Sequence, residues 1–225
     1  MKKVLCPLAI LAIIGAAAWW LPFGISTCYT NANYEDISSE AFFDLMIESG
    51  AMFVWFFHYM PVGDEAVPAL LPSPEQRKAV YERVHRFRQT KPIFSMDFQN
   101  DAEYVGGYIA GGRNYLHINA AGDVKPCVFI HYSNVNIHDH SLLDALKSPL
   151  FMAYHDGQPF NENMLRPCPM LESPEILRGM VKRTGAISTD LQSPESVDHL
   201  CEKCDSYAAC WKEKADMLWQ NSKEK

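Results

Sequence analysis

An alternation of strand-like and helix-like segments constrains the fold of this 225-residue chain more than any other feature. Apolar runs rich in aromatic and β-branched residues at 23–29, 52–60 and 93–98 predict three strands, with an amphipathic stretch between each pair. Successive parallel strands need crossover connections of this kind. The pattern therefore predicts a β-α-β-α-β unit of an α/β fold, which has too few strands to close a barrel.

Local signals place the two helices between these strands. Ser38 or Ser39 is positioned to cap the first helix, which we expect to end at Gly50. The second helix begins at residues 73–76, a capping box with proline at the first helical position. The dense aromatic run at 52–60 is typical of a strand that is buried on both faces of a parallel sheet.

The pattern changes after the third strand. Residues 115–119 and 124–132 flank a glycine-containing turn and predict a β-hairpin. Short helices are expected near residues 139–147, 174–184, 194–204 and 207–219. We place the domain boundary near 101–106, so that an α/β unit at 21–105 precedes a small α+β domain at 106–225.

Residues 1–20 form an apolar leader that has more than one interpretation. Lys2 and Lys3 precede an uncharged stretch from residue 4 to residue 25. This is the pattern of a signal peptide or of a short membrane helix, and equally that of a buried barrel helix that runs into a strand. Membrane contact through residues 4–25 is therefore one of the open alternatives.

Seven cysteines at uneven spacing make a poor disulfide framework and favour reduced thiols that bind metal. Cys201, Cys204 and Cys210 form a C-x2-C-x5-C run, in which short loops would let three thiolates converge on one metal centre. Cys127 and Cys168 are available as further ligands. Spacing alone does not separate an iron–sulfur cluster from a four-thiolate zinc site.

Two other features bear on function. The formal net charge is −7 and no block of Lys or Arg stands out, which argues against a nucleic-acid partner. Asp97 ends the third predicted strand, where a carboxylate either faces a barrel mouth or caps the following turn.

Several stretches match one family pattern when they are taken together. They are residues 23–33, 55–63, 97–101, 109–113 and 117–127, continued by Arg166-Pro167-Cys168-Pro169 and by the cysteines between 201 and 210. The combined pattern resembles the radical S-adenosylmethionine (radical SAM) enzymes that carry a SPASM-type auxiliary-cluster domain. The first two stretches resemble strands five and six of the barrel in that family, and the resemblance covers roughly residues 21–219.

The resemblance implies a fold class, α/β, with a partial (βα) barrel of the last strands followed by a small cysteine-rich α+β auxiliary-cluster domain. It implies [4Fe–4S] binding and oxidoreductase chemistry that often acts on a peptide or protein. By position, Ser26 and Asn33 match residues that face S-adenosylmethionine in the family. The implied cluster ligands are Cys127, Cys201, Cys204 and Cys210, with Cys168 as an extra one.

The sequence departs from the family pattern in two ways. The C-x3-C-x2-C loop that binds the catalytic cluster is absent, because only Cys6 and Cys28 precede position 127. Tyr108 and Lys214 stand where the family has cysteines. We therefore expect one cluster rather than two, and no cleavage of S-adenosylmethionine unless a partner chain supplies the missing barrel half; no catalytic residue is assigned.

Three alternatives stay open. The chain is one subunit of a split radical SAM enzyme, a zinc- or cluster-stabilised binding module with or without a membrane tether, or the product of a truncated reading frame. We favour a cytoplasmic location, because iron–sulfur assembly is cytosolic and a membrane helix running to Ile25 would destroy the strand at 23–29.

Overall fold

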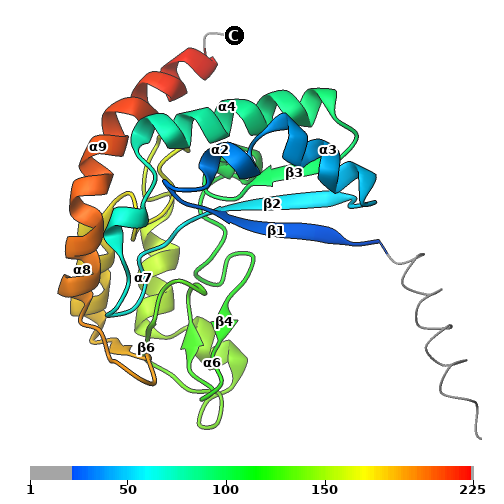
Figure 1. Ribbon diagram of the computed structural model, residues 1–225. Coiled ribbons are helices and arrows are strands. Elements are labelled where there is room, and N and C mark those ends of the chain that lie inside the picture. Colours follow the sequence, from blue (N-terminus) through cyan, green and yellow to red (C-terminus); the bar gives the residue numbers. More distant parts are fainter. Residues whose placement is uncertain (1–21, 224–225) are drawn as a thin grey trace, which may run out of the picture.

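A three-stranded parallel sheet organises the N-terminal part of the computed structural model, which describes residues 22–223 (Figure 1). The strands are β1 (Gly24–Tyr29), β2 (Phe53–His58) and β3 (Phe94–Asp97), in the order β1-β2-β3. Gly24 pairs with Phe53, and Phe53 pairs with Phe94. The three predicted strands and their parallel arrangement are confirmed.

Three helices cover one face of this sheet: α2 (Tyr34–Ile37), α3 (Glu40–Glu48) and α4 (Pro74–Thr90), the last preceded by the short helix η1 (Pro68–Leu70) (Figure 1). Both predicted caps form. Ser39 Oγ accepts the Phe42 N–H at 3.1 Å, and Ser73 and Gln76 make a complete capping box. The core between helices and sheet includes Phe43, Val54, Phe56, Val84 and Phe87.

The other face of the sheet is open. Side chains alternate between the faces of a strand, so one set of six large apolar side chains shares this face. They are Phe53, Trp55, Phe57, Phe94, Met96 and Phe98, and Phe94 is 63% exposed. The prediction that residues 52–60 are buried on both faces is therefore wrong, because α2, α3 and α4 lie on one side and leave Phe53 and Trp55 37% and 38% exposed on the other.

The chain continues into a mixed region. Helix α5 (Ala102–Val105) is followed by the predicted hairpin, whose strands β4 (His117–Ile118) and β5 (Val124–Lys125) pair antiparallel but are short. The side chain of Asn119 shapes the turn, since its Oδ1 accepts the N–H groups of Ala121 and Asp123 at 3.0 and 2.9 Å. Strand β6 (Tyr132–Ser133) pairs with β7 (Ile187–Ser188).

Four helices complete the fold: α6 (Leu142–Leu146), α7 (Pro149–Gly157), α8 (Pro174–Thr184) and α9 (Val197–Lys223). Helix α7 was not predicted. The two helices expected at 194–204 and 207–219 are one continuous helix, so the predicted break is wrong. No glycine or proline interrupts α9, and Tyr207, Ala208 and Trp211 beyond the expected break are buried, which favours continuation.

Helix α9 connects the two parts of the molecule. It contacts α8 along its first half and α4 further on, running along one side of the structure (Figure 1). Its buried residues join a second hydrophobic core with α7, α8 and the segment around residue 168. The buried thiols of Cys127, Cys168, Cys201 and Cys204 belong to this core.

Within residues 22–223, no helix has both the length and the apolar composition needed to cross a bilayer. The leader at residues 1–20, on which the signal, membrane and barrel-helix alternatives depend, lies outside the described residues.

Candidate metal centre

Cys127 and Cys168 line one cavity of about 580 Å³. Its sheet wall is the open face described above, through Trp55, Met96 and Phe98. Cys127 follows the hairpin and Cys168 precedes α8, so the fold brings together two thiols that are 41 residues apart in sequence. These are the two cysteines of the sequence prediction that the structure places in one pocket.

The thiol of Cys127 contacts a phenol. Cys127 is 3% exposed, and its Sγ lies 2.9 Å from the hydroxyl oxygen of Tyr115. A tight turn holds the residue, since its carbonyl accepts the Ile130 N–H at 3.2 Å. Burial, followed by the nearby Cys127, raises the pKa of Tyr115, so the phenol is neutral at physiological pH and is able to donate to sulfur.

Glu172 holds the backbone of Cys168. The Cys168 N–H donates to Glu172 Oε2 at 2.7 Å, and Cys168 Sγ accepts the Leu171 N–H at 3.4 Å. Burial and the adjacent Glu172 charge raise the pKa of the Cys168 thiol well above its usual range. Without a bound cation, this sulfur is therefore a neutral thiol, and binding a metal would require it to release a proton.

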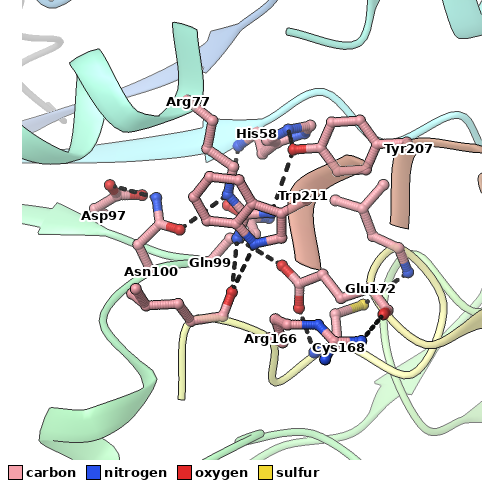
Figure 2. A network of polar contacts seen from close by, with 12 residues as sticks. His58, Arg77, Asp97, Gln99, Asn100, Arg166, Cys168, Glu172, Tyr207 and Trp211 are labelled. Atoms are coloured by element: carbon pink, nitrogen blue, oxygen red, sulfur yellow. Dashed lines mark hydrogen bonds and ion pairs between the residues drawn. The ribbon is translucent and has the colours of Figure 1, made fainter. Parts of the chain in front are cut away.

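Glu172 is part of a buried polar network that is centred on Arg77 (Figure 2). Arg77 donates to Glu172 Oε1 at 2.5 Å and to Asn100 Oδ1 at 2.9 Å, and its guanidinium lies 4.1 Å from the ring centre of Trp211. The Tyr207 hydroxyl oxygen accepts a hydrogen bond from Arg77 at 3.3 Å and lies 2.6 Å from His58 Nε2. The network ties β2, α4, the turn after β3 and α9 to the segment that carries Cys168.

Asp97 belongs to a turn and not to the cavity wall. It is fully buried, its Oδ2 accepts the Asn100 side-chain amide at 2.7 Å, and its N–H donates to Asp101 at 2.8 Å. Burial, followed by the charge of Asp101, raises its pKa to about 6. Of its two interpretations, shaping the turn after β3 agrees with this geometry.

Cys201, Cys204 and Cys210 do not converge. All three lie on α9, where Cys201 and Cys204 are buried one turn apart and Cys210 is exposed. Nine residues correspond to two and a half helical turns, so Cys210 lies on the side opposite Cys201. Burial raises the pKa of Cys201 and of Cys204 to about 12. The expectation that short loops would gather these three sulfurs is wrong.

The donor set has the chemical type of an iron–sulfur site but not its spacing. Four buried thiols lie in one core, and the cysteines of residues 22–223 form no disulfide. A [4Fe–4S] cluster uses four thiolates. Among the described residues, however, no three Cys, His, Asp or Glu side chains lie close enough to share a metal ion. A cluster here would require movement of α9 or of the segment around residue 168.

Ser26 and Asn33 do not line the cavity with the two thiols. Ser26 is exposed on the open face of the sheet. Asn33 shapes the turn after β1, since its Oδ1 accepts the Thr30 N–H at 2.7 Å and its Nδ2 donates to the Cys28 carbonyl at 3.1 Å. Their assignment to S-adenosylmethionine stays a prediction.

The sequence interpretation missed three residues of this site: Arg77, Tyr115 and Glu172. One signal was available for Arg77, which lies three and seven residues before Val80 and Val84 and therefore on the buried side of α4. A charge on that side needs a buried partner. Nothing in the local sequence indicates that this partner is Glu172, 95 residues away.

Comparison with known proteins identifies one domain in the chain. Residues 110–170, which include Cys127 and Cys168, match the family model of SPASM, an iron–sulfur cluster-binding domain. No curated protein matches the chain.

Two similar solved structures are native anSMEcpe with bound AdoMet (12% identity, TM-score 0.41) and the same protein with AdoMet and the Cp18Cys peptide (12% identity, TM-score 0.42). Each alignment covers 94% of this chain, and 60% and 61% of the respective anSMEcpe chains, so this chain spans about 60% of their length. It is the family match that shows the domain: over residues 110–170, the chain carries the pattern of the SPASM iron–sulfur cluster-binding domains, as its sequence predicted.

Proposed function

We propose that this chain is the iron–sulfur cluster-binding C-terminal portion of a radical SAM oxidoreductase of the SPASM type. In this proposal, residues 21–105 are the last strands of the barrel and residues 106–225 hold one [4Fe–4S] cluster. The observation that carries the proposal is the shared cavity of Cys127 and Cys168, both of which lie in the SPASM match.

The proposed ligands are Cys127 and Cys168 from the cavity wall, with Cys201 and Cys204 from the same core. Cys210 is the weakest candidate because it is exposed on the far side of α9. When bound, a cluster would supply electron relay or a substrate anchor. Glu172 would hold the backbone of Cys168, and the Tyr115 hydroxyl would hydrogen-bond a ligand sulfur, which is one way that proteins tune cluster potential.

Metal analysis tests this proposal. Protein purified without oxygen and reconstituted should contain iron and sulfide and absorb broadly near ~400 nm, as thiolate-bound clusters do. Cys127→Ala, Cys168→Ala and Cys204→Ala should each lose most of the metal, whereas Cys28→Ala, an exposed thiol outside that core, should keep it. Stoichiometric zinc without sulfide would overturn the proposal in favour of a zinc-stabilised module.

We also propose that the isolated chain does not cleave S-adenosylmethionine and that a second chain with the missing barrel half completes the enzyme. The open sheet face supports this, because parallel sheets are normally covered on both sides. Ser26, which is exposed on that face, would then reach the cofactor.

The isolated chain with reductant should release no 5′-deoxyadenosine above background, and robust release would refute the missing-half proposal. A peptide or protein substrate and a cytoplasmic location belong to the same proposal.

A second candidate function is a zinc- or cluster-stabilised binding module without a radical step. The same open apolar face favours it, since large exposed apolar surfaces mark interaction sites. Release of 5′-deoxyadenosine that appears only after addition of a chain with the C-x3-C-x2-C loop would favour the split enzyme over this module.

A further inference from the structure

We infer that the cavity between the open sheet face and the hairpin region is a binding site for an uncharged, apolar ring or branched hydrocarbon group. The inference rests on the proposed function only in that Cys127 and Cys168 form part of the wall.

The cavity has the size and lining of a small-molecule site. Its volume is about 580 Å³, within the range of about 300–1,000 Å³ that is typical of ligand pockets. Trp55, Met96 and Phe98 form one wall, and Tyr108 and Phe129 contribute to the others. These are the broad, polarisable surfaces against which aromatic and branched apolar groups gain most contact.

The cavity has an entrance. Phe94 and Tyr104 lie on its lining and are 63% and 62% exposed, so solvent reaches these residues from outside. Together with Trp55, at 38% exposure, they make an apolar rim that continues the open sheet face. An apolar group would therefore enter the cavity from the exposed face along these side chains.

Most polar groups of the wall already have partners; the buried exceptions among residues 22–223 are the Tyr108 hydroxyl and Asp101 Oδ1. The charged side chains that line the cavity, Arg88 and Asp101, form an ion pair with each other at 2.6 Å. The Gln99 Oε1 accepts the His58 N–H at 2.9 Å, and the Tyr115 hydroxyl is taken by Cys127. A charged or zwitterionic ligand would lose its hydration in the cavity and find no counter-charge there. This loss costs far more free energy for a charged ligand than for an apolar one. The wall chemistry therefore selects against charge.

The preference of the cavity for an uncharged ligand is tested with two dyes that share an anilinonaphthalene body. N-phenyl-1-naphthylamine is uncharged, and 1-anilinonaphthalene-8-sulfonate carries a sulfonate. Fluorescence titration of the full chain should give saturable binding of the neutral dye and at least about tenfold weaker binding of the anionic one, because the sulfonate would be buried unpaired.

A matched pair of variants locates the binding. Met96→Lys puts a charge on the cavity wall and should lower the affinity for the neutral dye by about tenfold or more. Met52→Lys changes the same residue type at a position that is 60% exposed and does not line the cavity, so it should leave affinity within about twofold. Should Met96→Lys fail to fold, Tyr104→Ser at the exposed rim serves instead, with an expected loss of about threefold from the removed ring.

The inference is overturned by no saturable binding of the neutral dye, by equal affinity for both dyes, or by equal loss of affinity in the Met96 and Met52 variants. Competition separates the sources of the apolar group, since toluene represents a free hydrocarbon and an end-capped Phe-Phe dipeptide amide represents a peptide side chain. Displacement by either supports the site, and displacement by neither overturns it. Titration of metal-free protein keeps this test independent of cluster binding: dye binding without iron incorporation would reject only the proposed function.

Discussion

Arg77 and Glu172, 95 residues apart in sequence, form an ion pair at 2.5 Å in which both side chains are fully buried. Glu172 uses its second oxygen to hold the Cys168 N–H. The pair therefore links helix α4, which covers the sheet, to the segment that carries a proposed ligand.

Removing one partner of this pair should destabilise the protein strongly. Arg77→Met or Glu172→Leu leaves a buried charge without a partner, which typically costs about 3–5 kcal/mol. The free energy of unfolding from urea titration measures this. Lys78→Met is the control, because its pair with Glu82 is accessible to solvent (side chains 29% and 54% exposed) and should contribute below about 1 kcal/mol. The double variant Arg77→Met/Glu172→Leu should cost less than the sum of the single variants, and a strictly additive result would contradict the pairing.

Asp97 should make stability depend on pH in a specific window. Its folded pKa of about 6 exceeds the ordinary value of 3.8, so between these pH values the folded state keeps a proton that the unfolded state has released. Stability from this group is therefore full below pH ~4 and is lost as pH rises through ~6. Asp97→Asn removes this dependence. As pH rises across the window, the free energy of unfolding of the variant should therefore increase relative to that of the natural protein by up to about 3 kcal/mol.

His58 affects the pH dependence of stability with the opposite sign, because burial holds its pKa well below 6.5. It is present in both proteins, so its effect cancels in the difference between variant and natural protein. Urea unfolding at several pH values between ~4 and ~7 gives that difference. A difference that does not change with pH would show that Asp97 is not buried as a neutral acid.

Thiol reactivity should divide the cysteines into two groups in metal-free protein. In a Cys6→Ser background, Cys28 and Cys210 are exposed and should react with a thiol reagent under native conditions. Cys127, Cys168, Cys201 and Cys204 should react only on unfolding, because they are buried. Mass spectrometry after alkylation assigns the sites. Fast reaction of Cys201 and Cys204 would indicate that this part of α9 opens readily.

Restoring a thiol at Tyr108 should raise iron content. Tyr108 lines the cavity with Cys127 and Cys168, and its hydroxyl has no hydrogen-bond partner among residues 22–223. A phenol is a hard oxygen donor and suits an iron–sulfur cluster poorly. Tyr108→Cys should therefore bind more iron per chain after reconstitution, whereas Tyr108→Phe should leave iron unchanged. Unchanged iron in Tyr108→Cys would mean that Cys127 and Cys168 do not belong to a site that this position completes.

The sequence alone determined the elements whose causes are local. Strand-forming runs, the Ser39 and Ser73 caps and the glycine turn of the hairpin depend on neighbours within a few residues, and each appears as predicted. The SPASM resemblance depended on spaced residues of the same kind and was confirmed over 110–170.

Tertiary structure decided the rest, because the deciding contacts join distant residues. The C-x2-C-x5-C spacing is compatible with loops or with a helix, and burial of Tyr207 and Trp211 selects the helix that separates Cys210 from Cys201. Arg77 meets Glu172, and Cys127 meets Cys168 at one cavity, only after the sheet and α9 are in place. Such pairings depend on which buried charges and apolar faces remain to be covered once the chain has folded, and no short stretch of sequence records that.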